Sequence, residues 1–161
     1  MKTSSSSLGE LLERLDTSKD ERVVRFSKTV GESDVYLYAG ITGDLHPNHV
    51  DLAYMQKTPY GERIAHGSLI IGYTSTTSTM FCRNVQAEYP DVVLVSYGYD
   101  RIRFIKAVKF GDTVSVTYRL KQVLKEEAKL VSEVHVHNQH EELVVVLTHI
   151  LKAIPSGSNH G

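Results

Sequence analysis

The chain has 161 residues and a single cysteine, Cys82, so no disulfide can form within it. Cys82 follows Met80 and Phe81 in an apolar run, and this context predicts a buried structural thiol rather than a nucleophile. The sequence also lacks a signal-type apolar segment near its start and any apolar stretch as long as a membrane span. We therefore expect a soluble, cytoplasmic protein with no membrane partner.

An excess of one charge is missing as well. Eighteen Lys and Arg residues stand against nineteen Asp and Glu residues, which gives a formal net charge of −1. A chain balanced in this way has no assured basic face, so nucleic acid is not expected as a partner. Apolar residues make up 41% of the sequence and charged residues 23%, which is typical of one globular domain.

The sequence contains no internal repeat and no linker that would divide it. A single domain is therefore expected over residues 1–161, with an ordered core at about 8–154. Small polar residues at Ser4–Ser7 and at 155–161 predict flexible tails. A stripe of leucines at helical spacing predicts a short amphipathic helix near the start. Its members are Leu8, Leu11, Leu12 and Leu15.

The first half of the chain is predicted to be mainly helical after one strand at 23–28. Thr29 and Glu32 have the spacing of a capping box, so a helix should begin at Thr29. Gly43 should end this helix, because glycine is the residue that most often follows a helix C-terminus.

The stretch after Gly43 should form a loop, a short helix and then a long one. Pro47 should keep the next residues in a loop, and Asp51 can cap a short helix that ends near Lys57. Residues 67–81 keep rough helical spacing over a length that would be unusual for a strand. They are rich in Ser and Thr, which predicts a helix that a sheet approaches closely.

The second half is rich in Val, Tyr, Thr and Ile and is divided by turn-like segments. The predicted strands are 92–105, 113–124, 130–138 and 143–153. Consecutive strands with short connections predict an antiparallel meander. The fold class is therefore α+β, with a curved antiparallel sheet around a long central helix.

Asp44 and His49 are the strongest candidates for chemistry. Pro47 shapes the loop between them and can bring the carboxylate and the imidazole together. Such a pair can take a proton from a water molecule and deliver one to a neighbouring carbon. The free amides at the start of the long helix, at Gly67, can support negative charge on a carbonyl oxygen, and a glycine allows the substrate to approach closely. The pattern predicts the addition or removal of water at an activated carbonyl compound.

Each of these residues also has an ordinary structural interpretation. Asp44 can cap a turn, His49 can be a polar loop residue, and His66 can cap the long helix or form a structural hydrogen bond. A metal site of Asp44, His46 and His49 is a further interpretation, but its spacing matches no zinc signature. The five other histidines are expected at exposed positions.

The segment 38–51 resembles the signature of the MaoC-like, (R)-specific enoyl-CoA hydratases, also called hydratase 2. It reads Tyr-Ala-Gly-Ile-Thr-Gly-Asp-Leu-His-Pro-Asn-His-Val-Asp. The family pattern is aromatic, small, apolar, Ser/Thr and then Gly-Asp-x-Asn-Pro-aliphatic-His. The resemblance extends through 61–67 and through 103–113, where the family usually has Pro at the place of Ala107. The order of elements over about 23–153 also fits.

This resemblance implies the hot-dog fold and a catalytic pair of Asp44 and His49 that adds water to C3 of a trans-2-enoyl-CoA thioester. Gly67 falls where the family binds the thioester carbonyl. The residues expected to contact the substrate are Gly67, His46, His66 and Ser68. No metal or organic cofactor is implied, because coenzyme A is part of the acyl-CoA substrate. A homodimer or a larger assembly of hot-dog units is implied as well.

Two positions depart from the family pattern. The family's Asn is His46 here, and its aliphatic residue before the catalytic histidine is Asn48. His46 is larger than asparagine and titrates near neutrality, so branched or carboxylated substrates, such as mesaconyl-type thioesters, compete with straight-chain ones as candidates. A hot-dog acyl-CoA thioesterase and a non-catalytic hot-dog binding subunit are the remaining candidate functions.

Overall fold

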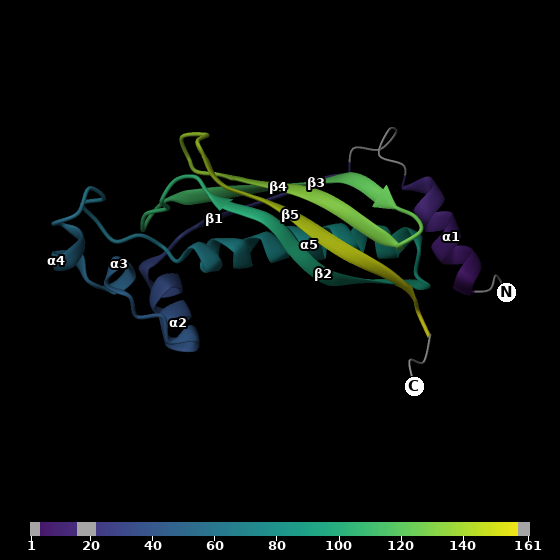
Figure 1. Ribbon diagram of the computed structural model, residues 1–161, viewed down its shortest axis with the longest axis horizontal. Coiled ribbons are helices and arrows are strands. Elements are labelled where there is room, and N and C mark those ends of the chain that lie inside the picture. Colours follow the sequence, from purple (N-terminus) through teal and green to yellow (C-terminus); the bar gives the residue numbers. More distant parts are fainter. Residues whose placement is uncertain (1–3, 16–21, 158–161) are drawn as a thin grey trace.

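The computed structural model describes residues 4–15 and 22–157, and a curved antiparallel sheet with a long helix along its concave side dominates it (Figure 1). The strands are β1 Val23–Thr29, β2 Val92–Phe104, β3 Thr113–Leu124, β4 Lys129–His137 and β5 Leu143–Pro155. The helices are α1 Ser4–Arg14, α2 Glu32–Thr42, α3 Pro47–Val50, α4 Leu52–Met55 and α5 Gly67–Glu88. The predicted α+β class is confirmed.

The strand order differs in one respect from the predicted meander. The sheet has the order β1-β3-β4-β5-β2, so β3, β4 and β5 pair in sequence, whereas β2 pairs with β5 and β1 pairs with β3. Between Phe104 and Thr113 the chain therefore passes from β2, at one edge of the sheet, to β3, which lies next to β1 at the other edge. This connection matters for the site, because the Val108 carbonyl accepts a hydrogen bond from the Ala65 amide at 2.8 Å, just before α5 begins.

Helix α5 begins at Gly67, as predicted, and continues past Phe81 to Glu88. Its Ile70, Phe81 and Val85 side chains are at most 1% exposed and belong to the main hydrophobic core. Burying a large aliphatic or aromatic side chain stabilises a fold by roughly 1.5–3 kcal/mol, so these contacts fix the helix against the sheet.

The threonines of α5 explain how a helix rich in hydroxyl groups can lie buried. The Thr74 hydroxyl donates to the Ile71 carbonyl at 2.7 Å, and the Thr77 hydroxyl donates to the Thr74 carbonyl at 2.6 Å. Both threonines are at most 2% exposed. Because each hydroxyl finds its acceptor within the helix, neither opposes the packing of this face.

The predicted capping box at the start of α2 is wrong. Thr29 lies in β1, where its hydroxyl bonds to that of Thr113 in β3 at 2.7 Å. The helix begins at Glu32 instead, and Asp34 Oδ2 accepts from the Gly31 amide at 2.8 Å. A carboxylate in the first turn of a helix is favourable because it satisfies a free amide and opposes the helix dipole.

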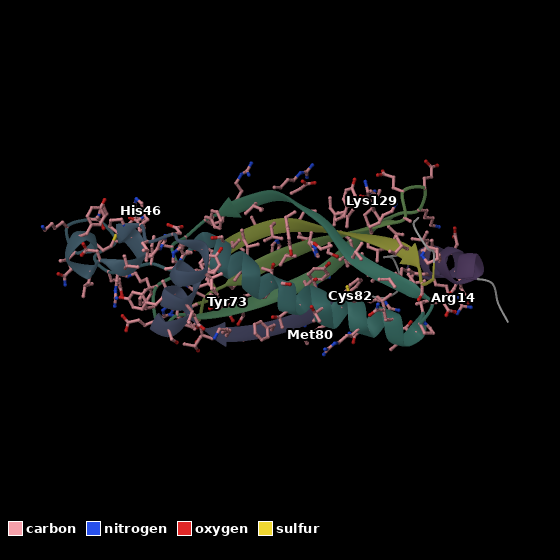
Figure 2. All side chains as sticks on the ribbon, turned by 90° about the horizontal axis from the view of Figure 1, so that it is seen from below. Arg14, His46, Tyr73, Met80, Cys82 and Lys129 are labelled. Carbon is pink, nitrogen blue, oxygen red and sulfur yellow. The ribbon has the colours of Figure 1, made fainter. Side chains whose placement is uncertain are left out.

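Helices α2, α3 and α4 lie beyond one end of the sheet, and α1 lies at the opposite end (Figure 1). Figure 2 shows this separation, with His46 at one end and Arg14 at the other. Pro47 is the first residue of α3, a helical turn where a loop was predicted, and proline suits this position because the first-turn amide needs no partner within the helix. Asp51 caps α4 as predicted, with Oδ1 accepting from the Tyr54 amide at 2.9 Å.

The leucine stripe forms α1 as predicted, although Leu15 directly follows its last residue, and three of the four leucines are buried. Two of the segments predicted to be flexible belong partly to regular structure, because α1 already begins at Ser4 and β5 continues to Pro155. Residues 1–3 and 158–161 of the predicted tails lie outside the described residues. Within the described ranges, every helix is too short or too polar to cross a membrane.

Candidate active site

Asp44 lies on the loop between α2 and α3. Gly43 ends α2 with φ 77°, a left-handed conformation that glycine adopts without strain. The Asp44 amide then donates to the Thr42 hydroxyl at 3.2 Å, and Asp44 Oδ1 accepts from the His46 amide at 3.4 Å. The Asp44 side chain is 50% exposed, so its carboxylate is open to water.

His49 lies in the single turn of α3. Its Nδ1 is 2.7 Å from the Ile64 carbonyl oxygen, which can only accept, so Nδ1 carries the proton and Nε2 keeps a free lone pair. Burial lowers the pKa of His49 below its ordinary value of 6.5, and the His66 and His46 rings act in the same direction against Asp44 and the Ile64 carbonyl. The imidazole is therefore neutral at neutral pH, which is the state that a base requires.

His66 precedes α5 and is 1% exposed. Its Nε2 donates to the main-chain carbonyl of Asp44 at 2.9 Å, which joins the Asp44 loop to the start of the helix. Its ring stacks on that of His49, with the centroids 3.7 Å apart and the planes at 26°. The polar contact of His66 is thus made with the loop, and the ring forms a platform for His49.

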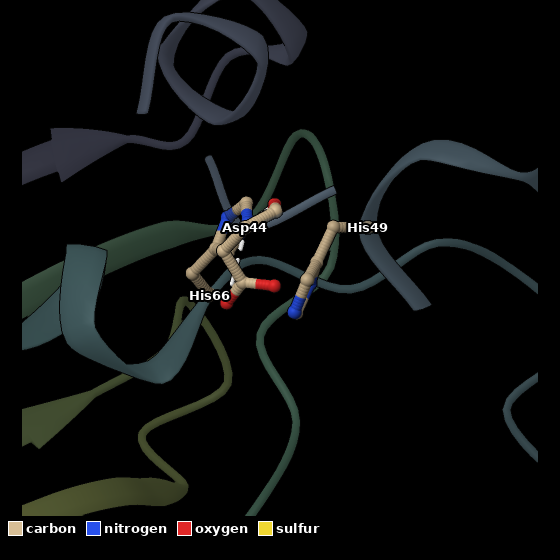
Figure 3. Close-up of side chains that lie close together, drawn as sticks. All are labelled: Asp44, His49 and His66. Atoms are coloured by element: carbon tan, nitrogen blue, oxygen red, sulfur yellow. Dashed lines mark hydrogen bonds and ion pairs between the residues drawn. The ribbon is translucent and has the colours of Figure 1, made fainter. Parts of the chain in front are cut away.

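Asp44, His49 and His66 come together at one end of α5 (Figure 3). One carboxylate oxygen and one ring nitrogen of each histidine lie within 4.8 Å of one another. Asp44 Oδ2 is 4.0 Å from His66 Nε2. A single water molecule can bridge polar groups at such separations. The predicted catalytic pair therefore stands within reach of one water.

These three groups could also be considered as metal ligands. A histidine that binds a metal through Nε2 carries its proton on Nδ1 and donates it to a further acceptor. His66 Nδ1 is buried without a hydrogen-bond partner in the described part of the chain, and His66 Nε2 is committed to the Asp44 carbonyl. The arrangement therefore fits acid–base chemistry on water better than a metal centre. His46, which the sequence suggested as a ligand, lies outside this group.

A cavity of about 460 Å³ opens beside the cluster. His49 forms part of its wall, together with Gly67 and Ser68 at the start of α5. Most of the remaining wall is apolar and includes Ile64, Ile70, Phe104, Val108 and Val145. An apolar cavity with a few converging polar groups is the usual form of a small-molecule site. Phe104 was not singled out from the sequence, because it is an ordinary apolar residue of a predicted strand.

The Gly67 and Ser68 amides begin α5 and have no hydrogen-bond acceptor among the residues that the structure describes. Free amides at a helix N-terminus carry partial positive charge. Because both residues line the cavity, these amides can support negative charge that develops on a bound carbonyl oxygen. Gly67 therefore lies where the sequence placed it, at the start of the helix and beside the candidate base.

His46 lies at the rim of this arrangement. Its side chain is exposed, and its Nδ1 accepts from the Asn48 amide at 3.4 Å, which caps α3. The His46 ring is 6.4 Å from that of His49, edge to face. The described residues that line the cavity do not include it. His46 therefore contacts the loop between Asp44 and His49 from outside the cavity.

His149 corrects the expectation that the remaining histidines are exposed. It is 1% exposed, with Nε2 2.9 Å from the Ser96 hydroxyl and Nδ1 3.0 Å from the Tyr118 hydroxyl. His149 lies two residues from Leu147 and from Leu151 in β5, so all three side chains share the buried face of the strand. This period of two along the strand was the signal that could have placed it in the core.

Comparison with known proteins also points to the addition or removal of water. Residues 14–143 match the family described as MaoC like domain. The (R)-specific enoyl-CoA hydratase of Rhodospirillum rubrum is 31% identical over 117 residues, which cover 73% of this chain and 76% of that protein. The 3-hydroxybutyryl-CoA dehydratase of Methylorubrum extorquens is 30% identical over 102 residues, which cover 63% of this chain and 60% of that protein.

Solved structures share the fold at lower identity. The (R)-hydratase from A. caviae superposes with a TM-score of 0.69 and 20% identity, over 85% of this chain and 98% of that one. An unliganded R-hydratase from Pseudomonas aeruginosa gives a TM-score of 0.61 and 24% identity, over 89% of each chain. The family match spans most of the sequence, so the chain belongs to the MaoC-like domain family, has its hot-dog fold and is an enzyme of the hydratase and dehydratase class.

Proposed function

We propose that this protein adds water reversibly to trans-2-enoyl-CoA thioesters and forms (R)-3-hydroxyacyl-CoA. The observation that carries the proposal is the placement of Asp44 and His49 within reach of one water, beside the free amides of α5 and an apolar cavity. The relative from R. rubrum bears the name of this activity, which supports the same reaction here.

The reaction needs a base for water and an acid for C2 of the acyl group, and one pair can serve both steps. Asp44 holds the water while His49 Nε2 takes one of its protons, and the remaining hydroxide oxygen forms the new bond to C3. The π electrons of the C2–C3 bond move toward C2 and the thioester carbonyl. The His49 imidazolium, whose charge the neighbouring carboxylate stabilises, then returns the proton to C2.

The electron pair that leaves the double bond is held for a time on the thioester oxygen. Gly67 and Ser68 line the cavity at the first turn of α5, and their amides can donate to this oxygen. Removing one such donor typically costs about 10²- to 10³-fold in rate in enzymes that stabilise an oxyanion. The start of α5 therefore supplies the electrostatic part of catalysis, and the loop residues supply the proton transfer.

The lining of the cavity favours straight-chain acyl groups over carboxylated ones. A mesaconyl-type substrate brings an extra carboxylate, which needs a counter-charge when it leaves water. Lys106 is the only permanently charged residue among the described residues that line the cavity, and it already pairs with Glu142. His46 lies at the exposed rim, so it can meet a carboxylate only outside the apolar part. Carboxylated thioesters are therefore the second candidate.

We propose that the reaction needs no metal or organic cofactor. The support is the hydrogen bond from His66 Nε2 to the Asp44 carbonyl, which leaves Asp44 and His49 to act on water alone. Dialysis of the protein against a chelator should leave the rate of hydration unchanged. A rate that falls on dialysis and returns with added Zn²⁺ would contradict this part of the proposal.

We also propose that the protein works as a homodimer. Large apolar side chains are exposed on α2 and on the edge strand β2, among them Leu37 at 66%, Ile41 at 82% and Val95 at 40%. An open strand edge and exposed apolar groups are the features that a second copy would cover. Sedimentation equilibrium should give twice the mass of the 18.0 kDa chain. A monomer at micromolar concentration would contradict the dimer.

Crotonyl-CoA, with the loss of absorbance of the conjugated thioester and a parallel assay for free thiol, tests the proposed reaction. Hydration should remove the absorbance without releasing thiol. Release of thiol would favour a thioesterase, and reaction only with mesaconyl-CoA would favour the carboxylated substrates. A protein that binds the thioester without changing it would be the non-catalytic subunit.

A further inference from the structure

The ring of Phe104 occupies the space in which residue 67 would carry a side chain. A Cβ atom built on Gly67 would lie 2.5 Å from Phe104 Cε1 and 2.7 Å from Cζ, closer than real Cβ atoms come to other heavy atoms. Residue 67 can therefore be only glycine while the ring stays where it is. The sequence suggested that this glycine admits the substrate, whereas the structure shows an aromatic ring against it.

Core packing alone does not account for this ring. Phe104 is 58% exposed, although it is the last residue of β2 and lies directly on the first residue of α5. An exposed ring recovers only part of the stabilisation that full burial of a phenylalanine side chain gives. The exposed side of the ring meets solvent rather than packed neighbours.

The position of the ring relative to the cavity gives it a role. Phe104 lines the cavity beside Gly67 and Val145, and His49 lines the same cavity. A substrate whose carbonyl reaches the Gly67 amide and whose C3 faces His49 must lie beside the ring. The ring is therefore a wall of the part of the cavity that would receive the acyl group.

We propose that Phe104 is a specificity-determining residue that holds short, crotonyl-sized enoyl groups against the Gly67 amide and disfavours long ones. This inference rests on the proposed hydratase function. With the ring in place, a short planar enoyl thioester is confined between the ring and the catalytic loop, which favours the reacting geometry. A longer chain must displace the ring, and this lowers its share of productive binding.

The first test compares Phe104→Ala with the unmodified protein on crotonyl-CoA and trans-2-octenoyl-CoA. The variant should lose about 10-fold in kcat/KM for crotonyl-CoA, mainly through KM, because an apolar contact of this kind is worth about 10- to 200-fold. The ratio of kcat/KM for octenoyl-CoA to that for crotonyl-CoA should rise about 10-fold. An unchanged ratio would overturn the proposal, and a merely structural role would lower both values together.

Tyr97→Ala is the matched control. Tyr97 is another exposed aromatic residue of β2, at 61%, and Lys129 Nζ lies 4.4 Å from its ring centroid. Lys129 is far from the His46 end of the molecule (Figure 2). The described residues that line the cavity do not include Tyr97. Its replacement should leave the ratio of the two substrates unchanged.

A double-mutant cycle tests the contact itself, apart from any activity. Gly67→Ala should lower Tm by about 2–4 °C for each kcal/mol that displacement of the ring costs. In the Phe104→Ala background the same glycine change should cost much less, because its Cβ then meets no ring. Equal Tm losses in both backgrounds would overturn the steric link between the two residues.

Different results would contradict the proposed function and the role of Phe104. If the unmodified protein hydrates neither substrate, the proposed function fails and the assignment of specificity fails with it. If it hydrates crotonyl-CoA but Phe104→Ala keeps the same substrate ratio, only the role of Phe104 fails. The Tm cycle tests the contact between Gly67 and Phe104 in either case.

Discussion

Two histidine clusters in this chain use the same side chain for opposite purposes. At the end of α5, His49 has one bonded nitrogen and one free nitrogen beside the half-exposed carboxylate of Asp44. In β5, both nitrogens of the buried His149 are bonded, to Ser96 and to Tyr118.

The difference shows what makes a histidine reactive. Burial lowers the pKa of both rings, and it lowers that of His149 to about 4. The Tyr99 ring also stacks on His149, with the centroids 4.5 Å apart. A neutral ring without a free nitrogen cannot exchange protons with a substrate, so His149 serves stability. His49 keeps a lone pair next to a carboxylate and can act as a base.

The cluster of Asp44, His49 and His66 is called the open cluster here, because His49 keeps a free nitrogen. The largest expected effect is the loss of activity when this cluster is changed. Asp44→Asn or His49→Gln should each lower kcat/KM for crotonyl-CoA by about 10²- to 10⁴-fold, because each removes a partner in proton transfer. Steady-state hydration assays and thermal unfolding should be measured together, and Tm should change little because both groups are partly exposed. His135→Gln is the control, because His135 lies on β4 and is not among the described residues that line the cavity. Near-normal turnover by either variant would refute the catalytic assignment.

The cluster of Ser96, Tyr118 and His149 is the closed cluster, because both nitrogens of His149 are bonded. It should control how the free energy of unfolding depends on pH. The pKa of an unfolded histidine is 6.5, and burial lowers the pKa of folded His149 to about 4. Between these pH values the unfolded state binds a proton that the folded state does not bind. The stability that His149 contributes is complete above pH 6.5 and falls by about 3 kcal/mol as pH drops to 4. Urea unfolding from pH 7 to 4.5 measures this.

The comparison for this measurement is His149→Gln, which cannot titrate. The variant should be less stable at pH 7 but should lose less stability on acidification than the unmodified protein. Parallel curves for the two proteins would show that His149 has an ordinary pKa in the folded state.

Opening the closed cluster from one side should have a smaller effect. Ser96→Ala removes the hydrogen-bond partner of His149 Nε2 and should lower the free energy of unfolding by about 1–3 kcal/mol. Hydration activity should stay within about twofold, because Ser96 contacts His149 and is not among the described residues that line the cavity. A large loss of activity would mean that the two clusters are not separate.

The smallest effect is expected at the rim of the open cluster. His46 is one of the groups that lower the pKa of His49, so His46→Asn should move the acid limb of the kcat/KM profile to higher pH. In the unmodified protein this limb should lie below the ordinary histidine value of 6.5. Activity at pH 8 should be largely kept. A limb that does not move would show that His46 only caps α3.

Much of the fold could be predicted because its signals are local. The four late strands and the start of α5 at Gly67 follow from residue type and period, and they are confirmed. Thr29 was misassigned because a threonine three residues before Glu32 suits a helix cap as well as a strand end. Its pairing with Thr113 in β3, which the local sequence does not specify, places it in β1. The partner of β2 also depends on the whole sheet, which a pattern of strands does not specify.

The site could be predicted in part for the same reason. Asp44, His49 and Gly67 lie in a motif, so spacing and resemblance were enough to select them, and the structure brings them together. The bond from His66 to the Asp44 carbonyl and the ring of Phe104 on Gly67 join segments that are distant in sequence. No local pattern specifies such contacts, because they arise only when the sheet closes around α5.

The configuration of the product of crotonyl-CoA hydration tests the central claim most directly. The unmodified protein and Asp44→Asn are incubated with crotonyl-CoA, and the 3-hydroxybutyryl thioester is resolved on a chiral column. We predict the (R) product from the unmodified protein and almost none from the variant. An (S) or racemic product, or equal yields from the two proteins, would contradict the account.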